Sequence, residues 1–222
     1  MKKTLFAAAA AVFAMAAGHA QAQEAGTVQV KLLGTAVMPD GKITDVDTDL
    51  VGLPADTQTR ANDNFVPTLA IEYFFTDYLS VETICCLTQH DVDATSGIPG
   101  AELVSNARLI PATVTAKLHA DLGAVKPYIG AGPSLFLWID EKPGSTAVDL
   151  GVDRFKMSNE LGFALQAGVD IPLGDGPMGV TLDAKRYFID TDAKWYVDGT
   201  KVIQTTHKLD PWVLSAGLSY RF

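Results

Sequence analysis

Residues 207–222, HKLDPWVLSAGLSYRF, decide the fold of this chain. From Trp212 onward, alternate residues are apolar with aromatic rings at both ends, and the residues between them are mostly small or polar. A period of two is typical of a strand with two different faces. In a soluble sandwich the apolar face meets a core, whereas in a transmembrane barrel Trp and Tyr gather at both rims of the lipid face. The aromatic ends favour the barrel.

The length of this stretch supports the same interpretation. The eight steps from Trp212 to Tyr220 span roughly 26 Å of strand, or about 19 Å of membrane depth at a tilt near 45°. That depth suits the apolar band of an outer-membrane barrel. A chain that ends on Phe222 directly after this pattern also resembles the carboxy-terminal signal of bacterial outer-membrane barrels, which predicts a contact of the last strand with the barrel assembly machinery.

Residues 1–22 have the features of a secretory signal peptide. Lys2 and Lys3 form a positive start, residues 5–17 are an apolar run too short to span a bilayer, and Ala20-Gln21-Ala22 supplies small residues for cleavage. The remaining residues, 23–222, are predicted to form one domain. No later stretch approaches the roughly 20 apolar residues of a membrane helix. The exported protein is therefore expected to be soluble in the periplasm or a barrel.

Charge and cysteine content exclude several classes of function. The chain carries 17 basic and 26 acidic residues, for a net charge of −9, and this acidic balance argues against nucleic acid as a partner. Cys85 and Cys86 are adjacent, so that on a strand they point to opposite faces and a disulfide between them would be strained. Two small neutral side chains are the simpler interpretation. No metal-ligand spacing and no cofactor motif is present.

Eight candidate strands with alternating short and long connections predict an all-β fold. The first long loop is polar, the third has room for a short helix, and the fourth can extend its flanking strands as a hairpin. Short turns on the periplasmic side and long loops outside are typical of an eight-stranded antiparallel transmembrane β-barrel. The expected strands cover residues 27–38, 65–75, 79–90, 107–119, 125–138, 158–170, 179–189 and 212–222.

Six segments of the mature chain resemble the OmpW/AlkL family of small outer-membrane proteins. The most specific are YFFTD at 73–77 and KPYIGAG at 126–132, and the others are Val81-Glu82, His90-Asp91, Ile189-Asp190-Thr191 and Asp210-Pro211-Trp212. The first and third long loops match poorly. The resemblance implies a barrel in the bacterial outer membrane, among its lipids and lipopolysaccharide. It also implies a narrow apolar channel for passive uptake of small hydrophobic molecules.

Strand parity assigns the residues that point into the barrel. An eight-stranded barrel has room only for side chains or one small ligand, and mixed charges in so small a space are expected to pair and form a plug. Glu160 is the main polar exception in the upper lumen. The lower lumen is predicted to contain Lys31, Glu72, Glu82, Lys117, His119, Asp183, Lys185 and Arg221. The upper, apolar lining is predicted to contain Leu33, Val66, Ile84, Leu109, Phe136, Trp138 and Tyr187.

The apolar upper lumen permits two interpretations. It is either a small core that seals the barrel or a pocket for an apolar solute, open to the outside and lined by Phe136 and Trp138. The family resemblance favours the pocket. A solute above a charged plug has to leave sideways, and Pro67, Pro111 and Pro133 lack amide donors that a strand ladder needs. These prolines are predicted to mark a lateral opening, with Pro111 and Pro133 nearly opposite each other. The simpler alternative is that they bend or end strands.

The same residues bear on three other functions. His90 and His207 are placed near the outer rim and His119 near the periplasmic turn, so they do not form a hydrolase triad, and the chain is predicted not to be an enzyme. Arg186 is predicted to face lipid near the outer rim, where it can reach lipopolysaccharide phosphates. The main alternative to transport is a structural or adhesive barrel whose long loops bind a phage, toxin or host protein.

Overall fold

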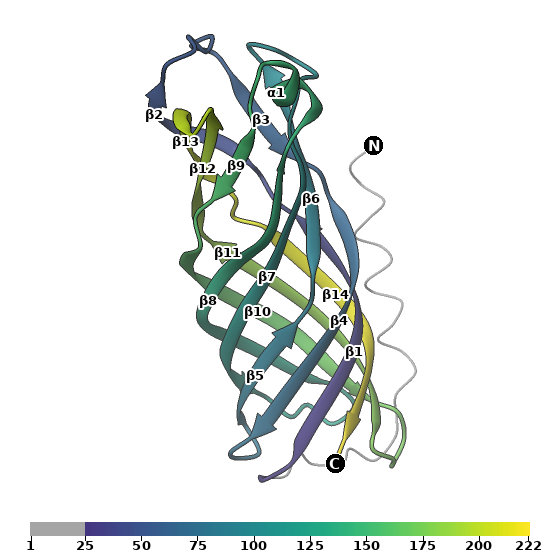
Figure 1. The fold of residues 1–222 in the computed structure, drawn as a ribbon. Coiled ribbons are helices and arrows are strands. Elements are labelled where there is room, and N and C mark those ends of the chain that lie inside the picture. Colours follow the sequence, from purple (N-terminus) through teal and green to yellow (C-terminus); the bar gives the residue numbers. More distant parts are fainter. Residues whose placement is uncertain (1–24) are drawn as a thin grey trace.

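Eight antiparallel strands form a closed barrel in the computed structural model, which describes residues 25–222 (Figure 1). The ring closes because β1 pairs with β14 and β7 pairs with β8. Each of the eight strands therefore pairs with a neighbour on both sides. The predicted barrel is confirmed, whereas the predicted signal peptide lies outside the described residues. The ring consists of β1 (Val28–Met38), β4 (Asn64–Phe74), β5 (Leu79–Cys85), β7 (Glu102–His119), β8 (Lys126–Pro143), β10 (Glu160–Pro172), β11 (Met178–Phe188) and β14 (Trp212–Arg221).

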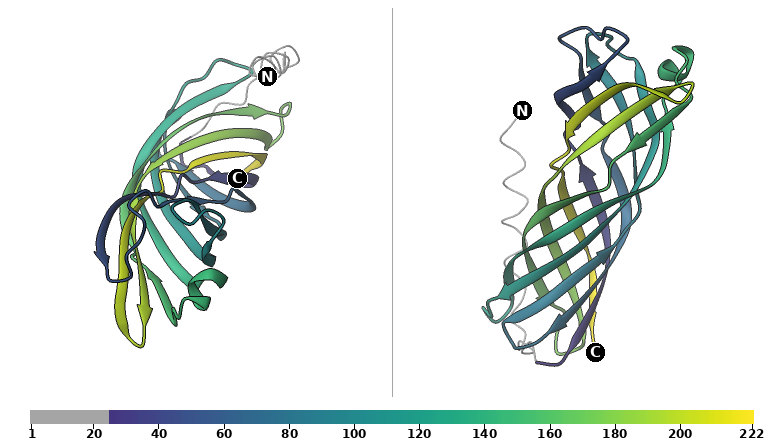
Figure 2. Two further views of the ribbon diagram at one scale, coloured as in Figure 1. Left: turned by 90° about the horizontal axis from the view of Figure 1, so that it is seen from above. Right: turned by 60° about the vertical axis from the view of Figure 1, so that its left-hand side comes forward.

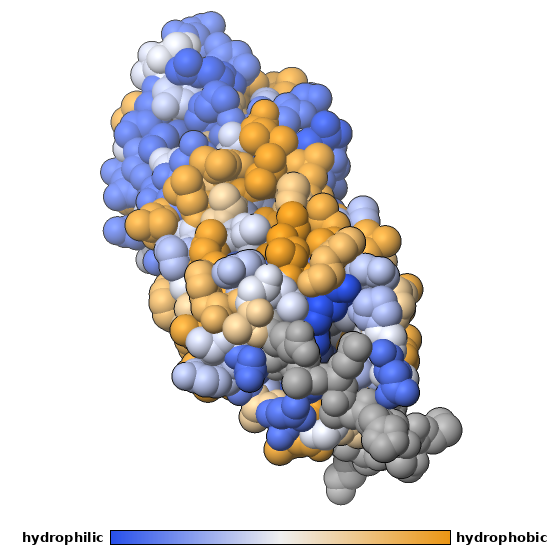
Figure 3. Space-filling view, turned by 90° about the horizontal axis from the view of Figure 1, so that it is seen from below, coloured by the Kyte–Doolittle hydropathy of each residue, from blue (hydrophilic) through white to orange (hydrophobic). Residues whose placement is uncertain are grey.

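Side chains alternate between the lumen and the exterior along these strands. On β14, Val213 and Ser215 are buried, while Trp212 and Leu214 are about half exposed, at 50% and 45%. Tyr220, at 41%, provides the aromatic residue at the other end of the exposed row. Figure 3 shows hydrophobic residues over the middle of the molecule and hydrophilic ones gathered at the far, outer end. The apolar face identified from the sequence is therefore the exterior of the barrel.

The long connections are folded rather than irregular, and they extend the barrel at its outer end (Figures 1 and 2). Four strands form a second sheet in the order β2-β13-β12-β9, and β3 pairs with β6, which in turn pairs with upper β7. The expected helix and hairpin are both present, in the third and fourth connections. The added elements are β2 (Lys42–Asp49), β3 (Gln58–Ala61), β6 (Thr88–Ser96), α1 (Ser145–Asp149), β9 (Arg154–Met157), β12 (Asp190–Val197) and β13 (Thr200–Lys208).

One strand expected to be continuous is divided. The sequence predicted a strand over residues 79–90, but Cys86 and Leu87 separate β5 from β6. Both cysteines are free thiols, with Cys85 exposed and Cys86 buried. The two thiols thus point to opposite sides of the wall, as adjacent residues of an extended segment do.

Helices contribute little to this fold. Among residues 25–222, every helical segment is too short or too polar to span a bilayer.

Candidate functional site

The lower half of the lumen contains a group of ion pairs, called here the lower cluster: Lys31, Glu72, Glu82, Lys117, Asp183 and Lys185. Lys31 Nζ lies 2.6 Å from Glu72 Oε2 and 2.8 Å from Glu82 Oε2. Lys117 Nζ approaches the same two oxygen atoms, at 2.9 and 3.0 Å. Because Lys31 comes from β1 and Lys117 from β7, the two lysines hold the carboxylates of β4 and β5 from either side.

Two residues of β11 complete the lower cluster. Lys185 Nζ lies 2.7 Å from Asp183 Oδ1 and 3.1 Å from Glu82 Oε1. Two neutral partners, Gln166 and Tyr128, were not predicted from the sequence. Gln166 Nε2 donates to Glu82 Oε1 at 2.9 Å and to Asp183 Oδ2 at 2.6 Å, and Tyr128 OH donates to Asp183 Oδ2 at 2.8 Å. The inward parity of both residues on their strands would have revealed them.

The lower cluster contains three lysines and three carboxylates, and a fourth buried carboxylate, Asp170, lies 3.9 Å from Lys31 Nζ. Every member is at most 7% exposed. Removing one partner from a buried pair costs about 3–5 kcal/mol, because the other charge is left in a medium of low dielectric. The arrangement therefore favours permanent structural pairing over acid/base chemistry.

Arg221 and His119 lie beside this cluster without joining its lysine pairs. Arg221 was matched to a carboxylate from the sequence, but its guanidinium donates to Gln29, its cross-strand neighbour, and within residues 25–222 it has no ion pair with an acid. His119 Nε2 lies 2.9 Å from Glu72 Oε1 and 2.8 Å from Ser80 Oγ. In a catalytic triad one ring nitrogen of the histidine contacts the nucleophile and the other contacts the orienting carboxylate, whereas here Nε2 makes both contacts.

An apolar cavity of about 50 Å³, called here the lumen cavity, lies above the lower cluster. Phe136 packs on Tyr187 with ring centroids 5.6 Å apart. Of the predicted lining residues, only Val66 does not border the cavity, although it packs in the same hydrophobic cluster. A volume of 50 Å³ holds a few water molecules, so a larger solute requires side chains to move. The lining includes Leu33, Ile84, Leu109, Phe136, Trp138 and Tyr187.

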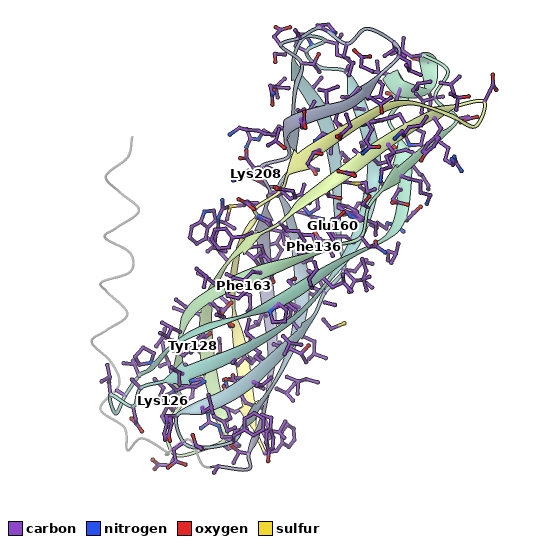
Figure 4. The ribbon with its side chains drawn as sticks, turned by 90° about the vertical axis from the view of Figure 1, so that its left-hand side faces the viewer. Lys126, Tyr128, Phe136, Glu160, Phe163 and Lys208 are labelled. Carbon is purple, nitrogen blue, oxygen red and sulfur yellow. The ribbon has the colours of Figure 1, made fainter. Side chains whose placement is uncertain are left out.

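Lys185 lies at the boundary between the lumen cavity and the lower cluster, since it lines the cavity and pairs with Asp183 below. Figure 4 shows the order of these residues along one side, with Lys126 and Tyr128 near the lower end, Phe136 above them and Lys208 higher still. Glu160, the expected polar exception, is half-buried and borders a polar groove together with Asp190 and Lys208. The change from charged to apolar lining therefore takes place within one layer of side chains.

Comparison with known proteins identifies the family. Residues 24–222 match the model of the OmpW family. This chain belongs to the OmpW family. An uncharacterized outer-membrane protein of Sinorhizobium fredii, y4mB, is 35% identical over 185 residues, which cover 82% of this chain and 76% of that protein. Outer membrane protein W of Escherichia coli is 25% identical over 223 residues, 99% of this chain and 100% of that protein.

Solved structures of OmpW-like barrels share this fold. The crystal structure of OprG from Pseudomonas aeruginosa has a TM-score of 0.78 and 24% identity, and covers 92% of this chain and 98% of its own. The NMR structure of AlkL in lipid bilayers has a TM-score of 0.71 and 21% identity, and covers 91% and 93%. This OmpW-family chain is therefore a barrel of the bacterial outer membrane, and its exposed apolar strand faces contact membrane lipids.

The three prolines of this OmpW-family barrel lie on three different strands and do not face one another. Pro111 was expected nearly opposite Pro133, but it pairs with Phe136, and Pro133 pairs with Phe163 on the other neighbouring strand. Pro111 is also buried and lines the lumen cavity, whereas Pro133 and Pro67 are exposed. The expectation failed because it counted from an assumed turn, and a shift of three residues changes both the partner and the face.

The hydrogen-bonded ladder of the barrel has a gap between β4 and residues 86–88, where β5 ends and β6 begins (the β5–β6 break). The pairing of β4 with β5 ends where Leu69 faces Cys85. Above it the amide side chain of Asn64 donates to the Gln89 carbonyl at 2.7 Å. Between these levels, no backbone hydrogen bond within residues 25–222 joins β4 to residues 86–88. The wall of the barrel is thus held there by contacts between side chains.

Pro67 belongs to this gap. Phe65 N–H donates to Asn64 Oδ1 at 2.8 Å rather than to a strand. Amide groups two residues apart on a strand point to the same neighbour, so the amide that Pro67 lacks is one that would face the gap. Of the three prolines, Pro67 is the one that the structure places at an unpaired edge.

The histidines of the upper lumen serve structural roles. His207 Nε2 contacts Thr205 Oγ1 at 2.6 Å, and its Nδ1 lies 3.3 Å from the Gly41 carbonyl. Burial lowers the pKa of His207 to about 4, so its ring is neutral at pH 7. His90 is held by Thr88 and by the Asn62 carbonyl, each at 2.8 Å. In the described residues no His, Cys, Asp or Glu side chains group in a way that holds a metal ion.

Proposed function

We propose that this barrel gives small hydrophobic molecules a passive route from the outer end, through the lumen cavity, and sideways into the membrane. The observation that carries the proposal is the change of lining at Lys185. Above it the lumen is apolar and incompletely filled, and below it the lower cluster begins. An apolar solute is stabilised by the upper environment.

The lower cluster acts as a plug in this proposal. A solute that moved further down would have to separate Lys185 from Asp183 and Glu82, and no water is at hand to replace those contacts. The plug also blocks ions, since its charges are already neutralised. A molecule in the lumen cavity therefore needs a lateral exit.

The gap between β4 and the β5–β6 break is the exit that we propose. Thr68 on one side and Ile84, Cys86 and Thr88 on the other all line the lumen cavity. On the outer surface the same stretch exposes apolar side chains, among them Leu87 at 49%. Opening this gap breaks no backbone hydrogen bond, so it costs less than opening a paired ladder.

A disulfide across the gap tests the exit. Thr68→Cys, with native Cys86 and with Cys85→Ser, places one thiol on each side. The matched control is Leu69→Cys with native Cys85 and with Cys86→Ser, because these two residues already face each other across the paired ladder just below. Uptake of 1-N-phenylnaphthylamine into proteoliposomes is measured for both, oxidised and reduced.

We expect oxidation to lower the uptake rate at least fivefold in the Thr68→Cys protein, with recovery on reduction, and to leave the control unchanged. Equal rates in the two oxidation states of the Thr68→Cys protein would exclude this exit. Uptake no faster than in empty liposomes for the unmodified protein would instead favour a structural barrel with a receptor surface.

Two contacts at the rims remain proposals. Near the outer rim the Arg186 guanidinium is bound to the Asp210 carbonyl and stacks near Trp212, with 5.4 Å between guanidinium carbon and ring centroid. These contacts support the proposal that the partly neutralised guanidinium binds a lipopolysaccharide phosphate. The exposed aromatic end of β14, Tyr220 and Phe222, supports recognition by the barrel assembly machinery.

A further inference from the structure

The outer extension contains a second apolar cavity, called here the outer cavity, of about 290 Å³. Its lining comes from the outer sheet, from β3 and residues 51–54, and from α1 and the β6–β7 hairpin. Figure 1 shows these elements gathered at the outer end of the molecule. It is nearly six times larger than the lumen cavity of about 50 Å³. The side chains that define it are Ile43, Leu53, Leu103, Trp195, Val202 and Ile203.

A layer of rings separates the two cavities. Trp195 lines the outer cavity, while Phe155 and His207 line the lumen cavity. The Trp195 ring lies 5.0 Å from that of Phe155 and 6.3 Å from that of His207, between centroids. Neither the ring layer nor the wall of the outer cavity contains a charged side chain. The outer cavity is therefore a compartment of its own and not the mouth of the lower one.

The polar atoms of the outer cavity are already engaged. Thr57 Oγ1 donates to the Pro54 carbonyl at 2.7 Å and Thr59 Oγ1 to the Gly41 carbonyl at 2.6 Å. Thr205 Oγ1 contacts His207 Nε2 at 2.6 Å. A ligand with a charge or several hydroxyl groups would lose its hydrogen bonds to water and find few replacements. The cavity thus selects against polar solutes.

The rim of the outer cavity is apolar on the side of the medium. Val51 is 56% exposed and Leu150 is 72% exposed, and both border the cavity. Neighbouring Leu50 is 68% exposed. Large apolar side chains gathered on an aqueous surface next to a cavity are typical of a binding site.

We propose that the outer cavity is a separate binding site for small, uncharged apolar molecules, in which Trp195 contacts the ligand and closes off the lumen below. Its volume lies at the lower end of the range for ligand pockets, so the ligand is small. A role of the outer cavity in capturing molecules before they enter the lumen cavity rests on the proposed function. Occupancy of the site does not depend on transport.

The experiment uses the full barrel in lipid nanodiscs with Trp195 as the only tryptophan, through Trp138→Phe and Trp212→Phe. 1-Bromohexane is the probe, because its bromine quenches indole fluorescence on contact. Val202→Phe fills the outer cavity, and the matched control Val213→Phe fills the lumen cavity. Migration of the unheated protein on a gel checks that each variant folds. If Val202→Phe fails to fold, Val202→Ser replaces it.

We expect saturable quenching of Trp195, an apparent Kd raised at least fivefold by Val202→Phe (at least twofold by Val202→Ser), and no change in Kd with Val213→Phe. Quenching that rises linearly without saturation, or that is weakened by Val213→Phe alone, overturns the site. Uptake measured in parallel separates the two proposals. Saturable quenching without uptake leaves the site in place and contradicts transport, whereas uptake without saturable quenching does the reverse.

Discussion

The lower cluster and the lumen cavity are formed by the same strands, whose side chains alternate between lumen and exterior in both. They differ in how tightly their side chains are fixed. In the lower cluster each side chain is fixed by directional contacts of 2.6–3.1 Å. In the lumen cavity Leu33, Leu109 and Phe136 are held by dispersion contacts, which are individually weak and tolerate rearrangement. The backbone of the barrel permits either kind of lining. Which residues point inward decides whether a level of the lumen is closed or can accommodate a solute.

The largest expected effect is on the stability of the lower cluster. Glu82→Gln keeps the shape of the side chain but removes the charge shared by Lys31, Lys117 and Lys185. Breaking buried pairs in this way is expected to lower the free energy of unfolding by about 3–5 kcal/mol. Urea unfolding in detergent micelles, followed by gel migration of the unheated protein, measures it. A loss below 1 kcal/mol would show that water reaches the lower cluster, and the plug would have to be abandoned.

The barrel and much of its lumen were accessible from the sequence because strand parity is a strict rule. Once Trp212, Leu214 and Tyr220 are assigned to lipid, the inward identity of neighbours such as Val213 follows. Pairing across strands follows less easily. The position of Pro111 opposite Phe136 depends on the residue where each turn begins, and a turn of uncertain length shifts the whole register.

The outer extension was less predictable for a different reason. The sequence shows polar connections with a possible hairpin, and the added strands are short and interrupted by bulges, for example between Trp195 and Tyr196. Their cohesion comes from contacts between distant connections, such as that of Phe155 with Trp195. Short strands stabilised by long-range packing leave no regular period to detect.

A smaller effect on stability is expected when His207, in the apolar upper lumen, becomes protonated. The pKa of His207 is lowered to about 4 by burial, from an ordinary value near 6.5. Between these values the unfolded chain binds a proton that the folded protein does not. The contribution of neutral His207 to the free energy of unfolding is therefore fully present above about pH 6.5. It decreases as the pH falls towards 4, and about 2 kcal/mol of it is lost at pH 5. Asp192 is the acidic group that acts on His207, and it opposes this shift.

The His207 effect is measured as the difference in urea midpoint between pH 7.5 and pH 5 for the unmodified protein and for His207→Gln. Other acids titrate in both proteins, so the comparison isolates His207. We expect His207→Gln to lose about 2 kcal/mol of the pH dependence. An identical pH dependence in the two proteins would mean that the ring is hydrated or protonated in the folded state.

The smallest effect is expected for an ion pair at the surface of the outer extension. Arg108 and Asp140 approach to 3.8 Å, with side chains 45% and 34% exposed. Asp140→Asn makes the same chemical change as Glu82→Gln, but water and salt screen these charges. The free energy of unfolding is expected to fall by less than about 1 kcal/mol, and the loss should shrink further at 1 M salt. Urea midpoints at low and high salt measure both. A loss as large as that of Glu82→Gln would mean that burial does not distinguish the two ion pairs, and that the rigidity of the lower cluster has another origin.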